Sequence, residues 1–211
     1  MLGDLYFTIV LVISLVLATT VHEFCHAWLA HRFGDPTGQL QGRLTLNPLA
    51  HLDVMGTLMI FLIHIGWAKP VEVNPHYFQH PKRDNALTAL AGPFANLIMA
   101  LVLAVITKYL GFLLPQFLGV FLGTFLDVNI MLFVFNMLPF PPLDGSKIIG
   151  IFIPERYQKS YQRYLKDGMV YFVAFLLIDQ FVLSSTFHFS LVQLFLGNLF
   201  VFVKTLLFLG N

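Results

Sequence analysis

Two histidines and a glutamate within five residues could bind and use a metal ion. His22 and His26 are four residues apart, so in a helix both imidazoles project from one face, with Glu23 beside them. Zinc takes about four ligands in a tetrahedron, and a catalytic site leaves one position for water. Glu23 could then accept a proton from that water, as in a zinc hydrolase. The alternative is that the two histidines bind nearby carbonyl groups and hold no metal.

Asp144 is the best candidate for a third ligand. It follows a proline-rich stretch, residues 139–142, that ends the preceding helical pattern. A carboxylate on unwound backbone can turn toward a metal held by another helix. Asp144 could instead cap a helix that starts near Ser146. The single cysteine, Cys25, could be a soft ligand in principle, but we expect it to be a small packing residue.

The composition indicates that a membrane surrounds these residues. The chain is 57% hydrophobic and 11% charged, with a mean hydropathy of +0.77, whereas about a quarter of the residues of a soluble domain are charged. Runs without charge occur at residues 5–21, 54–68, 85–107, 109–126, 128–143 and 180–203. A helix needs about 20 apolar residues to cross the bilayer. We therefore expect an all-α polytopic membrane protein, one domain over residues 1–211, with a bundle of about five to six transmembrane helices.

The first predicted helix, from Leu5 to about His31, carries the metal motif near its end. No basic region precedes it, so we expect it to be retained as a membrane span rather than cleaved. The Val54 segment, residues 54–67, is short for a crossing and is predicted to be re-entrant. With the N-terminus outside, all Lys and Arg except Lys108 then fall on one side. This distribution predicts a cell-membrane protein with its metal site near the cytoplasmic side.

Two short segments have the period of strands. Apolar residues alternate with polar ones from Leu40 to Leu46, and Val71 and Val73 alternate in the same way. We expect a small surface β-sheet that covers the protein or lies in the interface, because an open strand edge cannot face lipid.

Polar residues within the later apolar runs need partners. Asp84 is predicted to cap a helix from Asn85 to about Lys108, in which Gly92, Asn96 and Ala100 repeat every fourth residue. This stripe lets another backbone approach closely. Asn96 could have a structural or a catalytic role.

The next predicted helix, 117–138, carries two amides on one face, Asn129 and Asn136. For Asp127 in the same helix we favour a neutral, hydrogen-bonded carboxyl. The basic segment 147–166 is interpreted as a solvated loop, and apolar segments near 168–183 and 190–209 complete the bundle.

The remaining histidines are expected to have structural roles. His51 and His64 could support the site, but a loop bond and a packed side chain are favoured. The same structural interpretation applies to residues His31, His76, His80 and His188.

Three motifs in this order resemble the site-2 protease family of intramembrane zinc metalloproteases: HEFCH at 22–26, AGPFAN at 91–96 and NMLPFPPLDG at 136–145. The resemblance covers nearly the whole chain and is closest to short prokaryotic members without a PDZ domain. It implies that His22, His26 and Asp144 hold one zinc ion. It also implies that Glu23 is the general base and that Asn136 helps to stabilise the transition state.

The expected partners are the lipid bilayer and a transmembrane or membrane-anchored protein substrate. A helical substrate must unwind locally to expose its carbonyl groups, and pairing with a strand edge would replace the lost hydrogen bonds. No basic run suggests nucleic acid, and the sequence does not determine the oligomeric state. The alternatives are a membrane metal-ion-binding protein or transporter, and an inactive scaffold for client helices.

Overall fold

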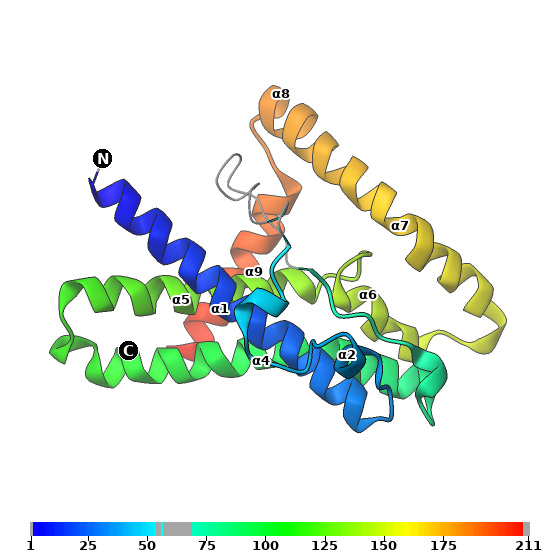
Figure 1. Ribbon diagram of the computed structural model, residues 1–211. Coiled ribbons are helices and arrows are strands. Elements are labelled where there is room, and N and C mark those ends of the chain that lie inside the picture. Colours follow the sequence, from blue (N-terminus) through cyan, green and yellow to red (C-terminus); the bar gives the residue numbers. More distant parts are fainter. Residues whose placement is uncertain (1, 54–55, 57–68, 209–211) are drawn as a thin grey trace.

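Helices α1, α4 and α5 form the centre of the fold. The computed structural model describes residues 2–53, 56 and 69–208. Helix α1 (Leu2–Arg32) crosses α4 (Pro81–Leu110) and α5 (Gln116–Asn136) and packs against both (Figure 1). The short 3-10 helix η3 (Gly111–Leu113) joins α4 to α5, so these two helices run antiparallel.

Shorter helices and two further long ones surround this centre. They are α2 (Thr37–Leu40), η1 (Pro48–Ala50), η2 (Pro75–Tyr77), α6 (Asp144–Ile148), η4 (Ile149–Phe152), η5 (Glu155–Tyr157), α7 (Gln158–Ile178), the π-helix η6 (Asp179–Ser184), α8 (Ser185–Phe187) and α9 (Leu191–Leu207). Helix α9 packs against α5, whereas α7 extends away from α1 (Figure 1). The ring of Phe172 in α7 contacts Phe135 and Phe140, which ties α7 to the end of α5.

Small side chains allow the central helices to approach closely. Ala18 of α1 and Ala100 of α4 are fully buried in one apolar cluster, together with Ile130 and Val134 of α5. Ala100 belongs to the predicted stripe of Gly92, Asn96 and Ala100. Because no large side chain separates the backbones here, polar groups on facing helices lie within hydrogen-bonding distance.

Within the described residues, four helices are long and apolar enough to cross a membrane. They are Gly3–Arg32, Pro81–Leu113, Gln116–Asn136 and Glu155–Phe187, while the apolar helix Leu191–Leu207 is shorter. The prediction of an all-α, multi-pass membrane protein is confirmed at this level. The prediction of five to six spans is not. The predicted re-entrant segment, 54–67, lies outside the described residues except for Gly56.

The strand predicted at 40–46 is wrong, and the described residues contain no β-strand. The chain instead leaves α2 and turns at Gly42, whose φ is +69°. Arg43, on the polar side of the predicted alternation, is buried and donates hydrogen bonds to the carbonyl groups of Ala50 and Lys69. At Arg43, the alternation that resembled a strand therefore marks a buried arginine that binds loop carbonyls.

The second predicted strand, at Val71 to Val73, is absent for a different reason. The backbone amides of Val71 and Asn74 donate to the side chains of Glu23 and Asp35, at 2.8 and 2.7 Å. These donors are therefore bound to α1 and to the loop that follows it, and they are not available for a neighbouring strand.

The structure differs from the sequence predictions at the start of α4 and in the segment 147–166. Helix α4 begins at Pro81, before the predicted start at Asn85, and Asp84 accepts a hydrogen bond from the His80 backbone amide at 3.0 Å from within the first turn. The predicted loop 147–166 is folded into short helices and the start of α7. Buried Tyr161 donates a hydrogen bond to the Ser146 carbonyl at 2.9 Å, which holds α7 to α6.

Asp127 is paired with a lysine side chain, whereas we predicted a neutral, hydrogen-bonded carboxyl group. Lys204 Nζ of α9 lies 2.6 Å from Asp127 Oδ1 of α5. A charge within an apolar helix is costly unless it is paired, so this ion pair stabilises the contact between the two helices.

We expect Ala100→Leu to destabilise the fold by about 1–3 kcal/mol, because added methylene groups at a fully buried position force neighbouring side chains apart. Thermal unfolding in detergent, followed by circular dichroism, measures this effect. Val102→Leu is the control because Val102, on the same helix, is 50% exposed. Equal midpoints for both variants would show that the α1 and α4 contact is not closely packed.

Candidate metal centre

Three electron-rich side-chain atoms converge where α1 meets the start of α6. His22 Nε2 lies 3.0 Å from His26 Nε2, and Asp144 Oδ2 lies 3.1 Å from each. All three residues are buried. The structure therefore brings together the two histidines predicted from their spacing and the aspartate predicted as the third ligand.

The second nitrogen of each imidazole binds helix α4. His22 Nδ1 lies 2.6 Å from Asn96 Oδ1, and His26 Nδ1 lies 2.7 Å from the Thr88 carbonyl oxygen. Both partners are acceptors, with the Asn96 amide oriented by its own contacts, so each Nδ1 carries the hydrogen. Both Nε2 atoms are consequently left with lone pairs that face Asp144.

Asn96, whose role the sequence left open, contacts a candidate ligand directly. Its amide nitrogen donates to the Ala18 carbonyl at 3.2 Å and to Asn129 Oδ1 at 2.9 Å, while Asn129 donates to the Phe125 carbonyl at 2.8 Å. These bonds determine which end of the Asn96 amide faces His22. The small-residue stripe predicted a close helix contact, but it did not indicate that the contact would orient a metal ligand.

Gly92 provides the space for the histidines. A Cβ atom at this position would lie 2.4 Å from His26 Nε2 and 2.6 Å from His22 Nε2, closer than real Cβ contacts. The third motif has a similar restriction, since a Cβ on Gly145 would lie 2.2 Å from the Leu138 carbonyl oxygen. Glycine at these two positions lets α4 and the 137–145 turn close around the site.

Asp144 does not cap helix α6; the backbone at the start of that helix positions its side chain. Leu143 is the N-cap residue of α6, no side-chain hydrogen bond caps this helix, and Asp144 is its first residue. Burial acts to raise the pKa of the Asp144 carboxyl, but nearby charge, including that of Lys147, holds that pKa well below its usual range. The ionised carboxylate is the form that binds a metal ion.

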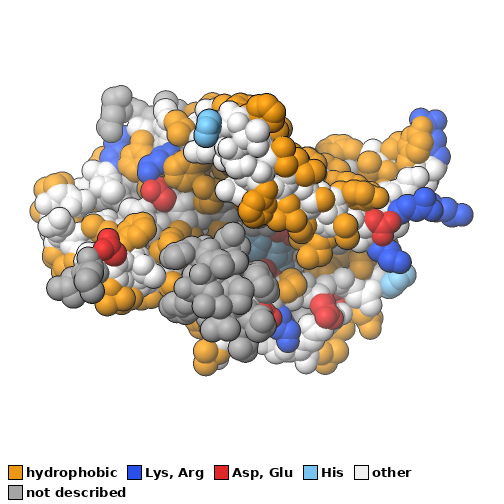
Figure 2. Space-filling view, turned by 90° about the horizontal axis from the view of Figure 1, so that it is seen from above, with side chains coloured by type: hydrophobic (Ala, Val, Ile, Leu, Met, Phe, Trp, Pro, Cys, Tyr) orange, Lys and Arg blue, Asp and Glu red, His pale blue; other side chains and the backbone are white. Residues whose placement is uncertain are grey.

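Glu23 and Asn136 line the same pocket as the three candidate ligands. This pocket has a volume of about 690 Å³, and histidine side chains are visible deep in a hollow of the molecule in Figure 2. Glu23 Oε2 accepts the hydrogen bond from the Val71 amide, so its second oxygen remains available. Asn136 donates to the Leu132 carbonyl at 3.0 Å, which uses one of its two amide hydrogens.

Other candidate residues do not join this group. His51 binds the Thr45 carbonyl at 2.8 Å in a loop, as favoured from the sequence. Cys25 is a free, half-buried thiol outside the set of converging ligands. Asp127 binds Lys204, and His64 lies outside the described residues.

The converging atoms fit a zinc ion. Three lone-pair donors that face one another repel unless a cation or shared protons lie between them. Tetrahedral zinc, with bonds of about 2.0–2.1 Å, holds its ligand atoms about 3.3–3.4 Å apart, close to the 3.0 and 3.1 Å separations found here. Two imidazoles and one carboxylate are also the ligand set of a catalytic zinc site with one position open to water.

Comparison with known proteins identifies relatives with the same chemistry. The profile of peptidase family M50 matches residues 113–179. The chain is 42% identical over 151 residues to "Putative zinc metalloprotease YwhC" of Bacillus subtilis, covering 68% of this chain and 69% of the relative. It is 36% identical over 147 residues to "Putative zinc metalloprotease Rip2" of Mycolicibacterium smegmatis, covering 65% of this chain and 54% of the relative. No solved structure matches the chain significantly.

We expect the purified protein to bind one zinc ion per chain. His26→Ala and Asp144→Ala should each weaken zinc binding by more than about 10–100-fold, which is the typical loss when a residue that only supports a ligand is mutated. Elemental analysis after dialysis against a weak chelator measures this loss. Exposed His76→Ala and Asp167→Ala are the matched controls. Zinc retained fully by Asp144→Ala would remove Asp144 from the ligand set.

We also expect Gly92→Ala to weaken zinc binding by about 10–100-fold, because the added methyl group displaces both imidazoles from their orienting partners. Competition with a chromophoric chelator measures the affinity. Gly123→Ala in α5 is the control, since a Cβ there meets nothing within 4 Å. If both variants bind zinc like the wild type, the contact between Gly92 and the histidines is not restrictive.

Proposed function

The chain belongs to peptidase family M50, the site-2 protease family of intramembrane zinc metalloproteases, and we propose that it hydrolyses a peptide bond in or near a transmembrane segment of a membrane protein. The observation that carries the proposal is the convergence of His22, His26 and Asp144 in one pocket with Glu23. Family membership favours hydrolysis over the metal-transport and scaffold alternatives.

Glu23 acts as the proton carrier in this proposal. Zinc, when bound, polarises the scissile carbonyl and lowers the pKa of water from about 15.7 to about 7. The free oxygen of Glu23 takes a proton as the water oxygen attacks the carbonyl carbon. Glu23 then gives that proton to the amide nitrogen as the carbon–nitrogen bond breaks. The Val71 amide keeps the carboxylate directed into the pocket during both transfers.

Asn136 stabilises the negative charge that develops on the carbonyl oxygen. Its amide lines the pocket, and one of its hydrogens remains after the bond to Leu132. A donor that is already positioned by such a bond needs little reorganisation when charge develops.

The segment that lines the pocket beside Glu23 is proposed to bind unwound substrate. Val71 and Val73 both face the pocket, and the structure records no hydrogen bond from the Val73 backbone to any described residue. The amide and carbonyl groups of Val73 can therefore bind the backbone of a locally extended substrate. This arrangement requires only a few backbone bonds and no preformed sheet.

The site is proposed to lie near the cytoplasmic side. Lys and Arg side chains gather mainly at one end of the molecule in Figure 2. Arg32, Lys82 and Arg83 lie at the ends of α1 and α4 near the metal centre. Basic residues at helix ends favour the cytoplasm.

We expect Glu23→Gln to reduce cleavage by about 10²–10⁴-fold, because the amide cannot accept the proton from water. Zinc content should stay near one per chain, since Glu23 is not among the converging ligands. The measurement is the mass-spectrometric yield of fragments from a pool of transmembrane peptides in detergent.

Glu72→Gln is the matched control because Glu72 is exposed and binds Gln41 rather than lining the pocket. Cleavage at the wild-type rate by Glu23→Gln would exclude Glu23 as the base. Cleavage lost in both variants would instead indicate damage to the loop.

A further inference from the structure

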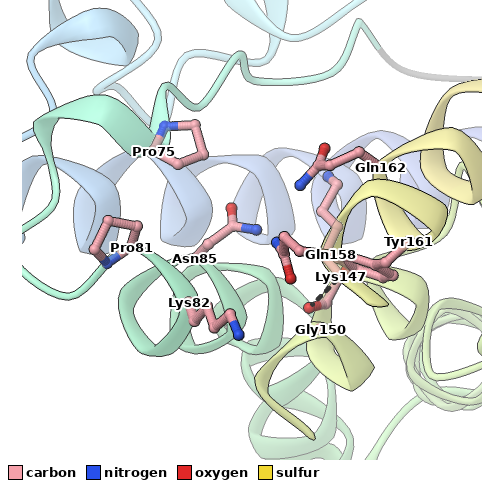
Figure 3. Close-up of a pocket in the computed structure, with 9 residues that line it drawn as sticks. All are labelled: Pro75, Pro81, Lys82, Asn85, Lys147, Gly150, Gln158, Tyr161 and Gln162. Carbon is pink, nitrogen blue, oxygen red and sulfur yellow. Dashed lines mark hydrogen bonds between the residues drawn. The ribbon is translucent and has the colours of Figure 1, made fainter. Parts of the chain in front are cut away.

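A second, smaller pocket adjoins the metal-site pocket. It has a volume of about 110 Å³, and the two pockets share Pro75, Asn85 and Lys147. Gln158 and Gln162 of α7 form part of its opposite wall (Figure 3). Because the two pockets have walls in common, a peptide that lies in the larger one can place a side chain in the smaller one.

Three side-chain amides of the smaller pocket make no hydrogen bond within the described protein. No hydrogen bond joins the side-chain amides of Asn85, Gln158 or Gln162 to any residue in the described part of the chain, and Gln158 Oε1 is buried without a partner. Figure 3 shows these three amides and Lys147 turned toward the same space. Buried polar atoms are normally hydrogen-bonded, so Gln158 Oε1 requires a donor from a ligand or from water, and the other amides are free to bind the same ligand.

The two lysines of the pocket differ in how far their charge is compensated. Lys82 Nζ donates to the Ile153 carbonyl at 2.9 Å and lies 2.6 Å from Glu155 Oε1. Lys147 Nζ lies 3.5 Å from Asp144 Oδ1, which is long for a hydrogen bond. The other oxygen of Asp144 faces the two histidines. Lys147 therefore keeps donor capacity and positive charge at the junction of the two pockets.

We propose that the smaller pocket binds an acidic side chain of the substrate, close in sequence to the bond that is cleaved. This inference rests on the proposed protease function. The carboxylate accepts hydrogen bonds from Lys147 and from the amides of Asn85 and Gln162, which are the contacts that an anion prefers.

A peptide fits the pocket better than a phosphate diester does. Gln158 Oε1 requires a hydrogen-bond donor, and the backbone N–H groups beside an acidic residue supply one, whereas a phosphate diester has none. A lipid can fill the pocket only if its headgroup adds a donor, as the hydroxyl groups of phosphatidylglycerol do, and the experiment includes that lipid as a contrary outcome.

Peptide binding to the zinc-loaded, full-length Glu23→Gln protein tests this inference without cleavage. The probes are fluorescent transmembrane peptides in detergent with one glutamate moved residue by residue along one flank, each beside its glutamine counterpart. We expect the glutamate peptide to bind about tenfold more tightly at one or two positions, as expected for a charged hydrogen bond. Adding Lys147→Met should abolish this preference, and Lys147→Glu should favour lysine peptides instead. Lys159→Met, an exposed lysine outside the pocket, is the control.

Three outcomes would overturn the inference. They are no glutamate preference at any position, a preference that survives Lys147→Met, and Lys147-dependent binding to phosphatidylglycerol nanodiscs by a protein indifferent to peptide charge. The protease function is tested separately by the zinc content of the wild type and by its cleavage of the same peptides. Cleavage without glutamate preference would thus reject this pocket alone, and preference without cleavage would reject the protease function alone.

Discussion

The structure depends on holding two imidazole nitrogens and a carboxylate oxygen within about 3 Å of one another inside an apolar protein. Such atoms repel in the absence of a positive charge, so the arrangement is stable only with a cation or with shared protons. The helices must also supply acceptors for the outer nitrogens. Helix α4 does this through Asn96 and Thr88, and Gly92 lets its backbone come close enough. The contacts that pack α4 against α1 are therefore the same contacts that orient the two histidines.

The same requirement extends from the site into the bundle. Asn96 orients His22, Asn129 orients Asn96, and a backbone carbonyl of α5 binds Asn129. In an apolar environment each of these amides would be costly without its partner, so each contact selects one arrangement of α1, α4 and α5. A rigid second layer of this kind holds the candidate ligands in position before substrate arrives.

The convergence of His22, His26 and Asp144 could be predicted from local spacing in the sequence. The positions of His22 and His26 on one helix face follow from helical geometry alone, and the proline-rich turn before Asp144 gave a physical reason for a mobile carboxylate to reach them. The role of Asn96 could not be predicted, because a small-residue stripe indicates close packing but not which side chain it meets. Arg43 and the ion pair of Asp127 with Lys204 depend on contacts between residues far apart in sequence, and no local pattern encodes those.

The proposed metal site combines ligands that the ribosome makes at very different times. Asp144 follows His26 by 118 positions, and at about 5–20 residues per second its synthesis comes roughly 6–24 s later. During that interval α1 enters the membrane with two histidines and Glu23 but without the carboxylate that completes the centre. A chain interrupted before α6 has only part of the ligand set. With Asp144 as the proposed third ligand, the order of biosynthesis would keep a newly inserted first helix inactive beside other nascent membrane segments until the bundle has closed around residue 144.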